Sequence, residues 1–286
     1  MADGRAAPRL EDFTGYMLRL AHTRAHAVAS EAFPDGPHPR EYAVLAAIAA
    51  VGPLSQQRLA ERLHVNRTLM VGVADALEGR GLVERQRDPA DRRSYALHAT
   101  PAGRAELERL HGAIEQADRR MTERLADPER ARLNELLRKL VSTDLEQVPP
   151  PLADRTGFLL TRAHFASRDR ADELLRPLGI LIRHYGLMTL MAAHGPSSQQ
   201  ALARRLSVSA TMITQIVDEM EVLGLAERRR NPDDRRSYLV TLTPDGKRKL
   251  RASRRAVTTV AGEIEDAIGE DGDRELRRLL QKLVGI

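Results

Sequence analysis

The stretch Gly52-Pro53-Leu54-Ser55-Gln56-Gln57 occurs twice in this chain, the second time as Gly195-Pro196-Ser197-Ser198-Gln199-Gln200. The offset of 143 residues holds without a gap when 52–104 is aligned with 195–247, and 27 of these 53 positions are identical. A unit of this length has the size of one domain. The 286-residue chain is therefore predicted to be a tandem duplication of a single domain.

Prolines mark the junction between the two repeats. Val148-Pro149-Pro150-Pro151 interrupts two helical patterns, and consecutive prolines favour an extended, semi-rigid spacer. We therefore expect an N-terminal repeat over residues 1–147, a linker over 148–153 and a C-terminal repeat over 154–286. A spacer this short favours close packing of the two repeats over independent domains.

Hydrophobic spacing and helix breakers predict the order of elements in the N-terminal repeat. Helices are expected over 10–31, 40–50, 55–63, 66–78 and 101–125, with a last one starting at 127. Ser55 and Thr100 are the expected N-caps. Strands are expected over 82–87 and 94–99, joined by a polar turn. Two short helices followed by a hairpin make a winged helix-turn-helix, so we predict a mainly α fold with small β-wings (α+β).

Both repeats carry the same ordered series of short motifs. The N-terminal repeat holds Leu59-Ala60-Glu61-Arg62-Leu63, Asp75-Ala76-Leu77-Glu78, Gly81-Leu82-Val83-Glu84-Arg85, Asp88-Pro89-Ala90-Asp91-Arg92-Arg93 and Thr100-Pro101-Ala102-Gly103. The C-terminal repeat holds Asp218-Glu219-Met220-Glu221, Gly224-Leu225-Ala226-Glu227-Arg228, Asn231-Pro232-Asp233-Asp234-Arg235-Arg236 and Thr243-Pro244-Asp245-Gly246. In this order, the motifs resemble the MarR family of bacterial transcriptional regulators.

The resemblance carries expectations about assembly and function. The family normally forms homodimers of one-domain subunits, whose first and last helices make the dimer interface. It therefore implies a covalently fused pseudo-dimer, monomeric as a chain, with a shared helical bundle of the dimerisation type and pseudo-twofold symmetry. It also implies a ligand-responsive repressor that binds double-stranded operator DNA. In the family, the helix Asp and the second Arg of the wing contribute to DNA binding, partly by pairing with each other. The resemblance therefore implies these roles for Asp75 with Arg93 and for Asp218 with Arg236.

Arginines concentrate in the two predicted wings. Those on the strands are expected to reach phosphates, and those at the tips are expected to reach into a narrow minor groove. They are Arg85, Arg87, Arg92 and Arg93 in one wing, and Arg228, Arg229, Arg230, Arg235 and Arg236 in the other. The alternative is a pair of solvated, charged hairpins that bind no ligand.

The second short helix of each repeat is the candidate for the major groove. The N-terminal repeat presents Asn66, Arg67, Thr68, Val71 and Gly72, and the C-terminal repeat presents Ser209, Ala210, Thr211, Thr214 and Gln215. Arg67 is suited to guanine and Gln215 to adenine. The side chains expected to face the core are Leu69, Val73, Leu77, Met212, Ile216 and Met220. Because the two helices differ, we expect an imperfect palindrome.

A small lipophilic or aromatic effector is the second expected partner, since many members of the family bind one between the dimer helices and the winged domain. Candidate lining residues are Tyr16, His22 and Tyr42 in the N-terminal repeat, and Phe158, His164, His184 and Tyr185 in the C-terminal repeat. The alternative is ordinary packing of these side chains. His22 and His26 have a spacing that suits a metal, but no carboxylate–histidine pattern accompanies them, so no metal or cofactor is expected.

Composition limits the remaining function classes. The chain has no cysteine, which excludes thiol catalysis and thiol-based peroxide sensing. Its longest apolar run, 43–51, is far shorter than the roughly 20 residues needed to span a bilayer, so a cytoplasmic protein without membrane contact is expected. An enzyme with winged helices for assembly is one alternative, but no glycine-rich cofactor loop appears. The other alternative is a winged-helix protein-interaction module that does not bind DNA.

Overall fold

The computed structural model describes residues 9–32, 39–63, 65–87, 95–142, 148, 150–232 and 238–286 of the chain. The chain forms two compact units, each built from segments of both repeats. Residues up to Leu20 and Phe165–Asp273 form the α12 unit, named after helix α12 (Ala210–Val222). Ala21–His164 and Arg274–Ile286 form the α4 unit, named after helix α4 (Arg67–Gly79). Each unit thus contains one winged helix-turn-helix together with a helical segment of the other repeat.

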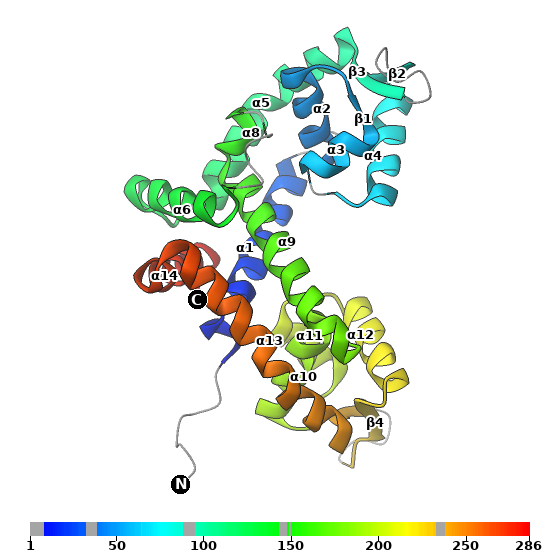
Figure 1. Cartoon of the computed structure of the whole chain (residues 1–286), viewed down its shortest axis with the longest axis vertical. Coiled ribbons are helices and arrows are strands. Elements are labelled where there is room, and N and C mark those ends of the chain that lie inside the picture. Colours follow the sequence, from blue (N-terminus) through cyan, green and yellow to red (C-terminus); the bar gives the residue numbers. More distant parts are fainter. Residues whose placement is uncertain are drawn as a thin grey trace. The chain divides into compact units, whose positions relative to one another are not determined.

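The α4 unit begins within helix α1 (Thr14–Ala32). Its winged domain consists of α2 (Pro39–Val51), β1 (Leu54–Ser55), α3 (Gln56–Leu63), α4, β2 (Val83–Arg87) and β3 (Tyr95–Ala99). The helices α5 (Pro101–Met121), α6 (Asp127–Leu140), α8 (Pro150–Ala153) and the first half of α9 (Thr156–Leu175) follow. The strands form an antiparallel sheet in the order β1-β3-β2, and α4 contacts both α3 and strand β2 (Figure 1).

The α12 unit repeats this order. After the 3-10 turn η1 (Leu10–Asp12), the start of α1 and the second half of α9, it contains η2 (Arg176–Leu178), α10 (Ile182–His194), α11 (Gln199–Leu206) and α12. The hairpin β4 (Ala226–Arg230) and β5 (Tyr238–Leu242) leads into α13 (Pro244–Ile268). Of the following helix, α14 (Glu270–Val284), only the start up to Asp273 belongs to this unit, and the rest belongs to the α4 unit. An isolated bridge between Ser197 and Val240 takes the place of β1. The predicted mainly α fold with small β-wings is confirmed.

Side-chain caps fix where the helices begin. Thr100 accepts a hydrogen bond from the amide of Gly103 (3.0 Å) and donates one to the carbonyl of Gly81 (2.7 Å), and Thr243 does the same in the C-terminal repeat. Ser55 caps α3 by accepting from the amide of Arg58 (3.3 Å). The predicted caps at Ser55 and Thr100 are therefore confirmed. These caps fix where α3, in the helix-turn-helix, and α5, after the wing, begin.

Two predicted segments differ from the structure. The helix expected over 10–31 is interrupted at Phe13, because Asp12 accepts a hydrogen bond from the amide of Arg9 (2.8 Å) and closes a separate turn before α1 starts. The proline segment was expected to be extended, but Pro150–Ala153 form one helical turn. Proline is tolerated there because the first residues of a helix need no N–H donor. Pro149 lies outside the described residues.

The cores of both units are mainly aliphatic, as the scarcity of aromatic residues requires. In the α12 unit, α10, α11 and α12 bury Leu187, Leu202 and Ile213 in one cluster. In the α4 unit, α2, α3 and α4 bury Leu45, Leu59 and Leu77. Among the described residues, none of the helices has both the length and the apolar character that crossing a membrane requires.

Candidate nucleic-acid interface

Helix α4 has one buried face and one exposed face. Its side chains Met70, Val73, Ala74 and Leu77 are buried in the core of the α4 unit. Asn66 caps the helix by accepting a hydrogen bond from the amide of Leu69 (2.8 Å). The predicted DNA-binding residues are all exposed: Asn66, Arg67, Thr68, Val71, Gly72 and Asp75. The structure therefore brings them together on a single helix face.

Helix α12 is arranged in the same way. Ile213, Ile216, Val217 and Met220 are buried, and Ser209 caps the helix by accepting from the amide of Met212 (3.1 Å). The predicted residues Ser209, Ala210, Thr211, Thr214, Gln215 and Asp218 are all exposed. Helices α4 and α12 thus each present a mostly polar face to solvent.

One predicted core position was wrong. Met212 is 49 % exposed, whereas Leu69 at the equivalent position is half-buried and packs against the core of the α4 unit. The i, i+3, i+4, i+7 spacing is satisfied by 213, 216, 217 and 220, which leaves Met212 at the edge of the exposed face. Met212 is therefore a candidate interface residue that the sequence analysis missed. Together with the exposed Val71, it provides apolar contact area suited to a thymine methyl group.

The first arginine of each wing is held by carboxylates of the preceding helix. Arg228 of β4 donates to Asp218 (2.6 Å) and to Glu221, and the Glu221 side chain also accepts from the Arg228 amide (2.8 Å). Arg85 of β2 donates to Asp75 and Glu78 in the equivalent arrangement. Both guanidinium groups are engaged by carboxylates of their own domain, which disfavours the phosphate contacts expected of these two strand arginines.

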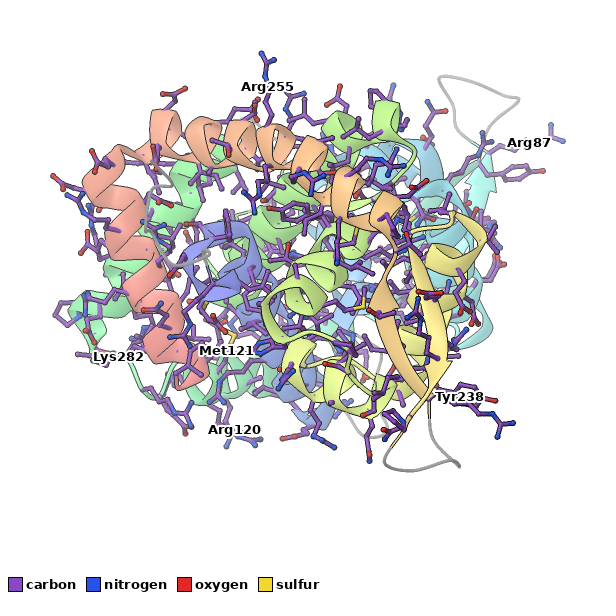
Figure 2. The ribbon with its side chains drawn as sticks, turned by 90° about the horizontal axis from the view of Figure 1, so that it is seen from below. Arg87, Arg120, Met121, Tyr238, Arg255 and Lys282 are labelled. Atoms are coloured by element: carbon purple, nitrogen blue, oxygen red, sulfur yellow. The ribbon has the colours of Figure 1, made fainter. Side chains whose placement is uncertain are left out.

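The outer ends of the wings carry a second pair of residues. Arg87 lies opposite Tyr95 in the β2–β3 register, and Arg230 lies opposite Tyr238 in the β4–β5 register. All four are exposed, and the side chains of Arg87 and Tyr238 project away from the ribbon (Figure 2). Arg229 pairs instead with Glu227 (2.5 Å). The predicted tip arginines Arg92, Arg93, Arg235 and Arg236 lie outside the described residues.

In the α12 unit, three predicted effector-site residues make defined contacts. The Tyr16 hydroxyl donates to the carbonyl of Arg205 (3.3 Å), and the Arg19 guanidinium lies over its ring at 4.8 Å from the centroid. Burial raises the pKa of Tyr16 and of Tyr185 above the usual value, and both rings contact the same apolar cluster. His184 is buried and contacts Glu219 of α12 (2.8 Å).

In the α4 unit, the other four predicted effector-site residues form two groups. The rings of His22 and His164 stack with centroids 4.8 Å apart, and His22 Nδ1 lies 3.3 Å from the hydroxyl of Thr161. Tyr42 is buried beside Leu110, and Phe158 packs against the same cluster. Within the described parts of the chain, no three histidine or acidic side chains gather as they would around a metal ion.

Comparison with known proteins gives consistent matches in both repeats. MarR-family models match residues 38–95 and 178–237. Over 112 residues, the chain is 40 % identical to a protein described as a transcriptional regulator for the hcr operon of Thauera aromatica, covering 39 % of this chain and 68 % of that protein. Over 131 residues, it is 29 % identical to the HTH-type transcriptional repressor NicR of Pseudomonas putida, covering 46 % and 83 %. A solved structure of mutant MarR from E. coli with operator DNA is 25 % identical, with a TM-score of 0.43, covering 44 % of this chain and 91 % of that one.

Proposed function

This chain belongs to the MarR family of transcriptional regulators, and we propose that it binds double-stranded DNA sequence-specifically with two recognition helices carried in one polypeptide. The observation that carries the proposal is the pair of exposed faces on α4 and α12. Each face combines polar side chains with one exposed apolar residue, Val71 or Met212, starts at a side-chain cap and is followed by a wing. A solvent-exposed helix of this kind fits the major groove of B-DNA.

The proposed division of contacts follows from the chemistry of each side chain. Arg67 on α4 reads guanine and Gln215 on α12 reads adenine through paired hydrogen bonds. Arg87 and Arg230 at the outer ends of the wings bind phosphates or a narrow minor groove. The tip arginines Arg93 and Arg236 are proposed to add contacts of the same kind. Asp75 and Asp218 support the interface by holding the strand arginines Arg85 and Arg228.

The two recognition helices differ in their exposed side chains, so the half-sites need not be equal. At the position of Gln215 the N-terminal repeat has Gly72, which has no side chain to read a base. We propose that one chain acts as a covalently fused pseudo-dimer on an imperfect palindrome. In this arrangement α12 specifies more bases than α4 does.

The regulatory outcome is proposed to be repression that an effector relieves. One relative is named a transcriptional repressor, which supports the first part. For the second part, each unit offers its own candidate contacts for a small lipophilic or aromatic ligand: the partly buried ring of Tyr16 in the α12 unit, and the partly buried ring of Phe158 with the stacked His22 and His164 in the α4 unit. Binding there competes with the packing that these side chains make in the present structure.

Selection of bound sequences from random duplex DNA tests this proposal. The intact chain is expected to enrich two half-sites whose centres are about one helical turn apart, with more invariant positions in one half than in the other. Absence of any enriched sequence would favour a protein-interaction module and would contradict the proposal. Enrichment of a perfect palindrome would contradict the unequal roles of α4 and α12.

A further inference from the structure

The carboxylate of Glu219 connects helix α10 to the exposed face of α12. Its Oε2 atom accepts hydrogen bonds from Arg183 Nε (2.9 Å) and His184 Nε2 (2.8 Å), both at the start of α10. Its Oε1 atom faces the amide of Gln215, whose Nε2 donates across 3.3 Å. The same carboxylate therefore contacts the scaffold with one oxygen and the proposed adenine-reading side chain with the other.

The orientation of the His184 ring is fixed from both sides. Its Nδ1 accepts a hydrogen bond from the backbone amide of Leu181 (3.1 Å), so in the neutral ring the proton resides on Nε2 and is donated to Glu219. The side chain of His184 is only 5 % exposed, whereas that of Glu219 is 28 % exposed. Glu219 thus lies between a buried anchor and the solvent-facing surface.

The charge of Glu219 is stabilised in this position. The hydrogen bond from Arg183, with that from His184, lowers the pKa of the Glu219 carboxyl below its usual value. The two other acidic residues of this part of α12, Asp218 and Glu221, are already engaged by Arg228. Glu219 therefore stays an ionised acceptor that points at Gln215.

An amide that donates one N–H to Glu219 keeps a second N–H and its carbonyl oxygen for DNA. These are the groups that a glutamine uses to read the N7 and N6 atoms of adenine. Holding the amide in one orientation also removes the flipped orientation, in which donor and acceptor exchange places. A fixed orientation lowers the entropy lost on binding and strengthens discrimination between bases.

We propose that Glu219 is a positioning residue for base recognition: anchored by Arg183 and His184, it orients the Gln215 amide and so sets the specificity of the C-terminal half-site. The inference rests on the proposed function of α12 as a DNA recognition helix. It adds that the start of α10 determines how strictly α12 reads one base pair.

The N-terminal repeat lacks this arrangement and provides an internal comparison. Its equivalents of Gln215, Glu219 and His184 are Gly72, Ala76 and Glu41. Glu41 instead accepts a hydrogen bond from Arg80 (3.2 Å), the residue directly after the C-terminal end of α4. No oriented amide is present at this place on α4, which agrees with a looser base preference in the N-terminal half-site.

The experiment compares base preferences of variants by selection from random duplex DNA, followed by affinity measurements on single-base changes. Gln215→Ala identifies the base pair that Gln215 reads. Glu219→Ala is expected to lower the preference at that same base pair at least fivefold, while affinity for the remaining sequence is retained or rises because a negative charge is removed. Glu219→Gln keeps an amide oxygen as acceptor and is expected to retain part of the preference.

Two controls separate positioning from general damage. In the Gln215→Ala background, Glu219→Ala is expected to have no further effect on base preference, a result that a purely structural role does not produce. Glu263→Ala removes a carboxylate held by Arg170 in the same unit and is expected to leave the preference unchanged. Full preference in Glu219→Ala, with loss in Gln215→Ala, would overturn this inference alone. Absence of any sequence preference in the unmodified chain would overturn the proposed function and this inference with it.

Discussion

The guanidinium of Arg228 donates a 2.6 Å hydrogen bond to the carboxylate of Asp218, and it thereby ties strand β4 to the exposed side of α12. The same arginine also binds Glu221, so one side chain fixes the angle between the recognition helix and its wing. Arg85 does the same for α4 with Asp75 and Glu78. Under the proposed function, helix and wing contact DNA together, and these clusters hold the two in position relative to each other.

Replacing the clustered arginines should affect binding through this link. Arg228→Ala leaves two carboxylates of α12 without their partner, and we expect the chain to lose about 1 kcal/mol of stability because the groups are partly exposed. DNA affinity should fall as well, although Arg228 is not expected to touch a phosphate. Urea denaturation and DNA titration of the same preparations measure both effects. Unchanged affinity with reduced stability would show that the wing keeps its position without Arg228.

The outer wing arginines should act as direct phosphate contacts. Arg87→Ala and Arg230→Ala are each expected to weaken binding and to lower the slope of log affinity against log salt by about 0.9, the value for one released phosphate contact. Lys139→Ala on α6 removes the same charge from an exposed position and serves as control. DNA titrations of all three variants at several salt concentrations give these slopes. If the Arg87→Ala and Arg230→Ala slopes equal that of Lys139→Ala, Arg87 and Arg230 are excluded from the interface.

Glycine is required where α5 and α13 begin. A Cβ atom on Gly103 would lie 2.0 Å from the carbonyl oxygen of Leu82, and one on Gly246 would lie 2.0 Å from that of Leu225. Because both contacts are with backbone, Gly103→Ala and Gly246→Ala should each cost about 3 kcal/mol through overpacking.

The same helices contain matched controls for this prediction. A Cβ on Gly112 or Gly262 would meet nothing within 4 Å, so alanine there should stabilise the chain by about 0.5 to 1 kcal/mol. Denaturation midpoints of the four variants should therefore shift in opposite directions. Destabilisation by all four would point to a general intolerance of alanine in these helices.

Glu129 should make part of the stability dependent on pH. Hydrogen bonds from Lys282, the backbone amide of Ala126 and Arg278 lower its pKa to about 2. The folded state then holds this proton less tightly than the unfolded chain, whose carboxyl has a value near 4.5. The contribution of ionised Glu129 to the stability of the fold is therefore present above pH 4.5 and is lost as the pH falls towards 2.

Comparison with Glu129→Gln isolates this contribution. The variant should be less stable than the unmodified chain at neutral pH, and the difference in unfolding free energy should shrink below pH 4.5. Chemical denaturation at a series of pH values measures it. A difference that stays constant with pH would mean that the charge of Glu129 contributes nothing.

Much of the fold was predictable because the deciding signals are local or repeated. The caps at Ser55 and Thr100 and the order of helices and strands follow from residues close together in the chain. The exposed face of α12 was predicted except for Met212, because the apolar positions of a short helix fit two placements that differ by one residue. The carboxylate partners of Arg85 and Arg228 were missed, since they depend on how the hairpin packs against the helix.

The contacts of Glu219 were also beyond sequence reasoning. Arg183 and His184 precede Glu219 by more than 30 residues, and nothing in their spacing indicates that all three side chains meet. The difference between Gly72 and Gln215 was visible in the alignment of the repeats. The reason that Gln215 is held in one orientation was not visible there.

The number of chains on one operator tests the central claim most directly. With a duplex that carries both selected half-sites, native mass spectrometry or sedimentation should show a complex of one 31.8 kDa chain per duplex. That result is predicted because each chain carries α4 and α12 with their own wings. A complex that always contains two chains on one pair of half-sites would contradict the account.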